Sequence, residues 1–306
     1  MTTTIGVYDS GIGGLTTLSV LMRRFPACGF CYYADNARMP FGTKSADEVK
    51  RAVNTALSKM SGECSRLVLG CNTASVTANP DGVFKLRPRL ENFSPATTLV
   101  LATPLTLAGL RAKEKGFMTA DTRELAVLVE ITASLKCKSR LRPDMSGLVG
   151  YLKEKLPPCG VERVVLGCSH YIYLAEQIAA LYPDVPVCDG NADLLKEIAE
   201  SVFPEKLSEN SARNASDVRP SADGATGIRN TDITPTTDLT EQSAAVSPAP
   251  FTAGEKYSPA SCRDEELRER VRSVKMFFTG EKEDKKYRWL LLKLLEGYAA
   301  AFRFPY

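Results

Sequence analysis

The sequence has no long hydrophobic run, almost no histidine and little excess of either charge. Its longest apolar stretch, LVLATPLTLAGL at positions 99–110, is too short to cross a membrane and contains threonine and proline. The formal net charge of +3, without a run of Lys and Arg, argues against nucleic acid as a partner. The N-terminal segment MTTTIGVYDSG lacks the basic flank and apolar core of a secretory signal. We therefore expect a cytoplasmic protein that has neither a nucleic-acid nor a membrane partner.

A metal centre is also not expected, because the sequence holds one histidine and one Cys-x-x-Cys pair. A structural zinc site needs a second such pair or two histidines beside Cys28 and Cys31. These two cysteines are more simply small apolar residues where a strand begins. The nine cysteines of a cytoplasmic protein are expected to be free thiols rather than a disulfide scaffold.

The glycine-rich turn SGIGGLT at positions 10–16 does not match a nucleotide-binding motif. The dinucleotide fingerprint needs a third glycine where Thr16 stands, and the phosphate loop needs Gly-Lys where GTKS has an intervening Thr43. The turn is more simply a tight connection from a strand to a helix. Its backbone amides could still hold a carboxylate.

Short apolar segments alternate regularly with longer amphipathic ones. We expect strands at 4–9, 30–35, 66–70, 97–102 and 163–167, and helices at 15–24, 45–61, 73–78, 105–115 and 173–181. This alternation is typical of parallel sheets covered by helices, in which ligands bind at the carboxyl ends of the strands. We predict an α/β protein of two pseudo-symmetric domains, each a mostly parallel sheet flanked by helices, with the active site in the cleft between them.

The expected domains are set by one compositionally unusual segment. Residues 205–261 are rich in Ser, Thr, Ala, Asp, Asn and Pro and nearly free of aromatics, so they are predicted to be a disordered low-complexity insertion. Residues 1–95 and 262–306 are expected to form the first domain, with the C-terminal tail docking back onto it. Residues 96–204 are expected to form the second domain.

One short phrase occurs twice, as RLVLGCNTA at 66–74 and as RVVLGCSHY at 163–171. In each copy a cysteine, Cys71 or Cys168, follows a glycine at the end of a predicted strand and enters a predicted helix. A helix N-terminus favours the thiolate and lowers the pKa of a thiol. Both cysteines are therefore predicted to be catalytic.

The duplication favours one reaction class over another. A Cys–His pair such as Cys168 and His170 would fit a nucleophilic hydrolase, but a hydrolase has no use for a second cysteine in a matching loop. A racemase must remove the proton from one face of a Cα and deliver another to the opposite face. Two similar thiols facing each other across a cleft meet that requirement.

Six segments together resemble the cofactor-independent glutamate racemases of the aspartate/glutamate racemase superfamily. They are IGVYDSGIGGLT (5–16), YADNARMPFGTKS (33–45), LGCNTAS (69–75), LVE (128–130), LGCSHY (166–171) and FFTGE (277–281). The resemblance implies Cys71 and Cys168 as the opposed acid–base pair, with Asp9, His170 and Glu130 as further catalytic groups. It assigns substrate binding to Asp9, Ser10, Phe41, Gly42, Asn72, Thr73, Ser169 and His170.

The same resemblance implies glutamate as the small-molecule substrate, D-glutamate for peptidoglycan as the product, and no cofactor, neither pyridoxal phosphate nor metal. We also expect a homodimer. Phe41, Ser169 and Ile172 stand where the family usually has Tyr, Thr and Pro. The alternatives are another racemase of the superfamily, such as an aspartate racemase, and a catalytically degenerate amino-acid-binding protein.

Overall fold

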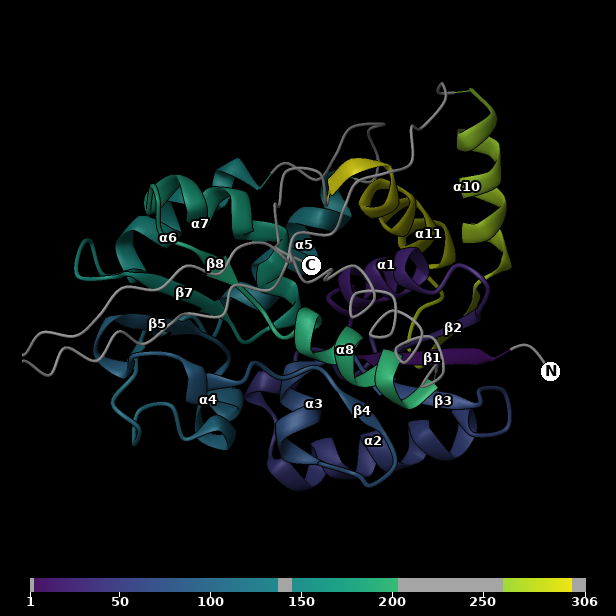
Figure 1. Ribbon diagram of the computed structural model, residues 1–306, viewed down its shortest axis with the longest axis horizontal. Coiled ribbons are helices and arrows are strands. Elements are labelled where there is room, and N and C mark those ends of the chain that lie inside the picture. The colour runs from purple at the N-terminus through teal and green to yellow at the C-terminus, as the bar shows by residue number, and fades with distance from the viewer. Residues whose placement is uncertain (1–2, 137–144, 203–260, 299–306) are drawn as a thin grey trace, which may run out of the picture. The chain divides into compact units, whose positions relative to one another are not determined.

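The computed structural model describes residues 3–136, 145–202 and 261–298 of the chain (Figure 1). The predicted disordered insertion lies outside these ranges as far as residue 260. Both sheets belong to one compact unit, Met1–Ile198 with Ser258–Phe304. No helix within the described ranges is long and apolar enough to cross a membrane.

Two parallel sheets form the framework. The first consists of β1 (Thr4–Asp9), β2 (Gly29–Ala34), β3 (Arg66–Leu69), β4 (Phe84–Lys85) and β9 (Lys275–Phe278), in the order β4-β3-β1-β2-β9. The second consists of β5 (Thr98–Leu101), β6 (Met118–Thr119), β7 (Arg163–Leu166) and β8 (Val187–Cys188), in the order β6-β5-β7-β8. All the strand pairs are parallel, so the predicted α/β class is confirmed.

The two sheets repeat one topology. In chain order, β1 to β4 are arranged as β2-β1-β3-β4, and β5 to β8 are arranged in the same way as β6-β5-β7-β8. Strand β9 is an addition at the β2 edge of the first sheet. The predicted pseudo-symmetry is therefore confirmed, while the expected domain boundaries stay a prediction.

The helices follow the strands as the alternation predicts. They are α1 (Gly14–Arg24), α2 (Ala46–Met60), α3 (Asn72–Thr77), α4 (Pro104–Leu110), α5 (Leu125–Lys136), α6 (Val149–Lys155), α7 (Ala175–Leu181), α8 (Asn191–Val202), α10 (Ser261–Ser273) and α11 (Asp284–Lys293). Helix α2 begins at a capping box, in which Ser45 and Glu48 satisfy each other's backbone amides. Its apolar residues recur every three or four positions and are buried.

Two helix predictions are corrected at one end. The helix expected at 105–115 ends at Leu110, because Arg111 takes a left-handed conformation with φ of 54°. The helix expected at 173–181 is α-helical only from Ala175, since Ser169–Leu174 form a 3-10 helix. Strands β4, β6 and β8 have two residues each. Segments that short carry no readable periodicity, so they were not predicted.

The helices that follow the strands also pack in a symmetric way. Helix α3, which follows β3, packs against α4, which follows β5. Helix α1, which follows β1, packs against the 3-10 helix that follows β7. Each contact joins the helix after the first strand of one repeat (β1 or β5) to the helix after the third strand of the other (β7 or β3), so the two contacts are equivalent. Because Cys71 opens α3 and Cys168 precedes the 3-10 helix, this packing brings both predicted catalytic cysteines to the junction of the sheets.

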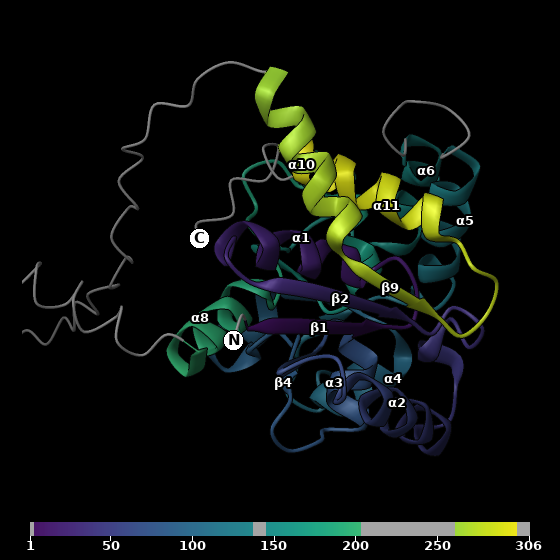
Figure 2. The same ribbon diagram turned by 90° about the vertical axis from the view of Figure 1, so that its right-hand side faces the viewer.

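The C-terminal tail belongs to the first sheet. Figure 2 shows α1, α10 and α11 on one side of this sheet and α2 and α3 on the other. Strand β9 pairs with β2, and α11 packs on α1. The Arg23 side chain donates hydrogen bonds of 2.7 and 2.6 Å to the backbone carbonyls of Leu294 and Leu295. The tail therefore closes over the helix that follows Asp9.

Removing a buried side chain from this tail should destabilise the whole unit. Leu291 in α11 is fully buried, so Leu291→Ala is expected to lower the free energy of unfolding by about 2–5 kcal/mol. Urea unfolding followed by circular dichroism measures it. Lys285→Ala, at an exposed position of the same helix, serves as the control. An unchanged unfolding midpoint for Leu291→Ala would mean that the tail does not contribute to the core.

Candidate active site

The two repeated cysteines line one small cavity. Cys71 lies directly after β3 as the N-cap of α3, and Cys168 lies directly after β7. The cavity has a volume of about 10 Å³, close to the space that one water molecule needs. Its lining includes nine of the residues predicted for the site: Ser10, Phe41, Gly42, Cys71, Asn72, Thr73, Cys168, Ser169 and His170. Thus two thiols from equivalent positions of the two repeats share one cavity.

The other two predicted residues lie one contact behind the cavity. Asp9, at the end of β1, accepts a 2.9 Å hydrogen bond from the Ser169 hydroxyl. Glu130, on α5, lies 3.0 Å from Nε2 of His170. Both carboxylates are buried. They therefore act on the cavity through Ser169 and His170 rather than by lining it.

The surroundings of Cys71 keep its thiol protonated. Its Sγ lies 3.8 Å from the Ser10 hydroxyl. Burial, helped by the negative charge of Asp9, raises the pKa of Cys71 to about 12, although the backbone amide of Ala74 acts in the opposite direction. The prediction that the helix N-terminus lowers this pKa is wrong. The desolvation of a buried thiolate outweighs the amides of a helix of six residues.

The surroundings of Cys168 are different, because a histidine lies against it. Burial alone would lower the pKa of His170, but contacts with Cys168 and Glu130 raise that pKa well above its ordinary value. Burial alone would raise the pKa of Glu130, but His170 and Lys286 hold it down at about 2. The stable state of the pair is therefore an imidazolium facing a carboxylate. The Cys71 thiol thus lies near the Asp9 carboxylate, whereas the Cys168 thiol lies near the His170 imidazolium, which can carry a proton.

Lys286 completes this buried chain of charges and was not among the predicted site residues. Its Nζ lies 2.9 Å from one Glu130 oxygen, and the other Glu130 oxygen contacts His170. Nζ also contacts Glu283 at 3.1 Å, and the side chain is only 12% exposed. Lys286 lies within the charged run EKEDKKYR, where no local signal distinguishes it from its neighbours.

The glycine-rich turn binds carboxylates of the protein itself. The Gly11 amide donates a 2.8 Å hydrogen bond to Asp9, and the Ile12 amide donates one of 3.1 Å to Glu130. A Cβ at Gly13 would lie 2.3 Å from the Ser169 hydroxyl, and one at Gly11 would lie 2.6 Å from Glu130. Glycine is needed here because the turn lies directly against the second repeat.

Burial also affects the state of Asp9. Desolvation raises the pKa of this carboxyl group, against the opposing effects of His170 and of hydrogen bonds from Gly11 and Ser169. The hydroxyls of Tyr32 and Tyr173 stabilise the glycine-rich turn after Asp9. They donate hydrogen bonds of 2.7 and 3.1 Å to the carbonyls of Gly11 and Ile12. Asp9 is thus held by hydrogen bonds from the first repeat, through Gly11, and from the second repeat, through Ser169.

The polar wall beside Cys71 presents one free acceptor and a cluster of hydroxyls. The amide nitrogen of Asn72 donates to the Leu86 carbonyl at 3.2 Å, whereas its Oδ1 is buried without a hydrogen-bond partner. The hydroxyl of Thr73 lies 3.0 Å from that of Thr103 and 2.9 Å from that of Thr106. Thr103 was not among the predicted site residues, although it comes after β5 as Ser10 comes after β1 and therefore has a counterpart in the repeat.

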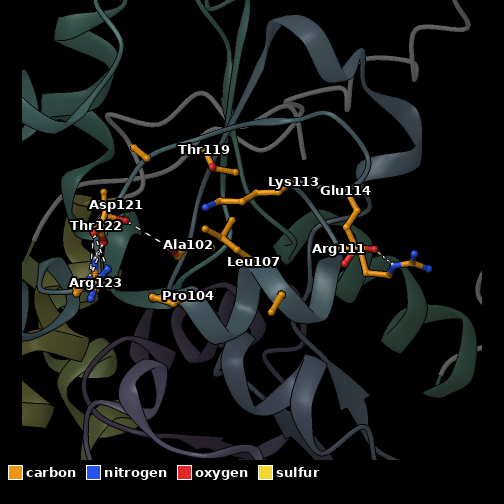
Figure 3. A pocket seen from close by; sticks show the side chains of 12 residues that line it. Ala102, Pro104, Leu107, Arg111, Lys113, Glu114, Thr119, Asp121, Thr122 and Arg123 are labelled. Atoms are coloured by element: carbon orange, nitrogen blue, oxygen red, sulfur yellow. Dashed lines mark hydrogen bonds and ion pairs between the residues drawn. The ribbon is translucent and has the colours of Figure 1, made fainter.

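A larger cavity is lined by other residues. It has a volume of about 450 Å³ and lies beside α4, with the Arg111–Glu114 and Asp121–Arg123 ion pairs at its two ends and Lys113 between them (Figure 3). None of the predicted site residues lines it. Among the described residues, no group of three or more His, Cys, Asp or Glu side chains is placed to hold a metal ion.

Comparisons with known proteins agree with this geometry. No family model matches the chain. The glutamate racemase of Halothermothrix orenii is 30% identical over 215 residues, which cover 63% of this chain and 83% of that protein. The glutamate racemase of Clostridium novyi is 31% identical over 224 residues, which cover 66% of this chain and 84% of that protein.

The chain belongs to the glutamate racemase family.

A solved structure supports the same assignment. The crystal structure of a glutamate racemase from Francisella tularensis in complex with D-glutamate superimposes with a TM-score of 0.51 at 26% identity. The matched region covers 67% of this chain and 82% of that one. The racemase fold predicted from the sequence, with its two parallel sheets, is therefore supported both by sequence relatives and by three-dimensional comparison.

Proposed function

We propose that this protein interconverts L- and D-glutamate by two-base proton transfer, without pyridoxal phosphate or a metal ion. The observation that carries the proposal is that Cys71 and Cys168 line the same cavity from equivalent strand ends of two repeats. One sulfur removes the Cα proton from one face of the substrate, and the other delivers a proton to the opposite face. In the reverse direction the two sulfurs exchange roles, so atoms and charges balance over a cycle.

The two halves of the site are not chemically equivalent. Cys71, with its pKa raised to about 12, rests as a thiol and is suited to donate a proton. Its neighbour Asp9 disfavours a second negative charge there, so Cys71 regains a proton after each turnover in which it acts as the acid. On the other side, His170 is held as an imidazolium against Cys168 and can exchange a proton with that sulfur. Glu130 acts as a positioning residue that keeps His170 charged, and Lys286 helps to keep Glu130 ionised.

The polar groups of the cavity fit an amino acid with two carboxylates. The unpartnered Oδ1 of Asn72 is an acceptor suited to the substrate ammonium. The hydroxyls of Ser10 and Thr73 are donors suited to the carboxylates, and Phe41 and Gly42 close the cavity beside them. The Ser169 hydroxyl donates to Asp9 and is left as an acceptor for the ammonium. A cavity of about 10 Å³ cannot hold glutamate, so binding requires its walls to separate.

The direct test is a cofactor-free racemisation assay. The purified full chain, incubated with L-glutamate in a chelator and without pyridoxal phosphate, is expected to produce D-glutamate, measured by chiral chromatography. L-aspartate, treated in parallel, is expected to remain unchanged. Failure to form D-glutamate, or formation only after a cofactor is added, would refute the proposal. D-aspartate as the main product would make the protein a different racemase of the superfamily.

We further propose that the protein is a cytoplasmic homodimer whose D-glutamate is used for peptidoglycan. Expression of the chain without a secretion signal should restore growth of a bacterium that requires added D-glutamate. The double variant Cys71→Ser, Cys168→Ser is the matched control and should not restore growth. Light scattering of the purified protein should give twice the 33.3 kDa mass of the chain. A mass of one chain in the active protein would refute the dimer.

A further inference from the structure

Two cysteines outside the active site lie in contact with each other. Cys31, on β2, is 1% exposed, and Cys64, in the turn that leads into β3, is 8% exposed. The two side chains lie close enough to shift each other's pKa, and both are free thiols. The Cys-x-x-Cys motif would have paired Cys31 with Cys28. The structure instead places Cys64, from a distant part of the chain, against it.

A glycine in the strand between them makes this contact possible. Strand β1 lies between β2 and β3, and Gly6 of β1 pairs with Cys31 of β2. A Cβ at Gly6 would lie 2.6 Å from the Cys64 sulfur, so this sulfur occupies the space of the missing side chain. Paired residues of neighbouring strands, about 4.8 Å apart, project to the same face of a sheet. The Cys64 sulfur therefore crosses β1 and reaches Cys31.

The charges around the pair make the two thiols unequal. Lys275 of β9 pairs with Cys31 in the sheet, and its Nζ lies 2.6 Å from Glu63, the residue before Cys64. The hydrogen bond from Cys64, together with the charge of Lys275, lowers the pKa of Cys31 against the effects of burial and Glu63. The same hydrogen bond and burial raise the pKa of Cys64. Cys31 is thus suited to attack an oxidant as the thiolate, and Cys64 is suited to form the disulfide with the oxidised Cys31.

We propose that Cys31 and Cys64 form a redox-active dithiol that a peroxide converts to an intramolecular disulfide. The Cys31 sulfur attacks the peroxide, the O–O bond breaks, and a sulfenic acid and one water are formed when the peroxide is hydrogen peroxide. The Cys64 sulfur then attacks this sulfenic acid, the S–S bond forms, and a second water leaves. Two thiols are oxidised by two electrons and one peroxide is reduced to two waters. The bond would link β2 to the turn before β3, across β1.

Exposure alone predicts a different order of oxidation. Cys159 is exposed and Cys28 is half-buried, whereas Cys31 and Cys64 are buried. If access governed the reaction, Cys159 would be oxidised first and Cys28 before Cys31. If Cys31 and Cys64 react as a pair, their disulfide should instead form before Cys159 is oxidised, or at the same time. The Glu63–Lys275 ion pair beside the two thiols is largely exposed.

The test uses the full, reduced chain and hydrogen peroxide in about equal amounts. The protein is then denatured, its remaining thiols are alkylated with N-ethylmaleimide, and it is digested with trypsin. Cleavage yields residues 25–38, which contain Cys28 and Cys31, and residues 60–66, which contain Cys64. The expected result is a disulfide between these two peptides, with N-ethylmaleimide located on Cys28 by fragmentation. Dithiothreitol should abolish the linked species.

Variants give the matched controls. Cys28→Ser should keep the linked peptides, whereas Cys31→Ser and Cys64→Ser should each lose them. The proposal is overturned if Cys28 provides the bridging sulfur. It is equally overturned if Cys31 and Cys64 both carry N-ethylmaleimide after Cys159 has been fully oxidised. The wild-type mapping decides between these outcomes even if a serine variant does not fold.

Discussion

Replacing either Cys71 or Cys168 with serine is expected to reduce racemisation at least about 10³-fold in both directions. A serine hydroxyl is a far weaker base than a thiolate at neutral pH, and each direction needs an acid and a base on opposite faces of Cα. The two sulfurs enter the cavity from strand ends of different sheets, so we expect that neither can replace the other. Chiral chromatography of L- and D-glutamate after incubation measures the effect.

Isotope exchange separates the two thiols in this experiment. In D₂O, a single remaining thiol can still remove a proton from the enantiomer that it faces and return deuterium to the same side. The two variants should therefore label opposite enantiomers. Cys159→Ser, at an exposed position, is the control and should racemise normally. Near-normal racemisation by either active-site variant, or labelling of the same enantiomer by both, would contradict the two-base mechanism.

The second large effect is expected from Glu130→Gln, with a loss of racemisation on the order of 10²-fold. The carboxylate is one of the groups that keep buried His170 charged, so its neutral replacement should lower the pKa of His170. The imidazolium is then lost at a lower pH than in the wild type. His170 is the only histidine of the chain, so ¹⁵N NMR of the imidazole reports this titration without overlap.

Glu130 should also make a pH-dependent contribution to stability. Its pKa is lowered to about 2 in the folded protein, so its stabilisation is present above the ordinary pKa near 4.5. It is lost as the pH falls towards 2. The difference in unfolding free energy between wild type and Glu130→Gln should therefore be largest above pH 4.5 and shrink in acid. A difference that grows in acid would have the wrong sign for a buried, paired carboxylate.

Lys286 provides a graded version of the same experiment. Lys286→Met removes the cation behind Glu130 and should weaken racemisation, whereas Lys286→Arg should restore part of it. Because a positive charge near the imidazolium is lost, the histidine pKa should rise in Lys286→Met, opposite to its direction in Glu130→Gln. Lys285→Met, at an exposed neighbouring position, should behave as wild type. An unchanged imidazole titration in both Glu130→Gln and Lys286→Met would show that these residues do not act through His170.

Local sequence determined the strands that carry the chemistry. The segments ending at Asp9, Leu69 and Leu166 are short and apolar, and polar or sulfur-bearing residues follow each one. In parallel sheets the carboxyl ends of strands meet at one edge, so a repeated Gly-Cys phrase after a strand identifies candidate site residues without any knowledge of packing. The same reasoning located Asn72 and His170, because each lies within two residues of Cys71 or Cys168, whereas Asp9 and Ser10 were assigned through the resemblance to the racemase family.

Only the tertiary structure decided the chemical state of those groups. A pKa depends on burial and on neighbouring charges, and for Cys71 both come from elsewhere in the fold: desolvation and Asp9 reverse the direction expected from its helix N-terminus. Lys286 contacts Glu130, which lies 156 positions away in the sequence, and no periodic pattern in the sequence predicts this contact. Cys31 meets Cys64 rather than Cys28 because Gly6 leaves room between their strands. Strand ends are set by local patterns, whereas charges and partners are set by which distant residues the packing brings together.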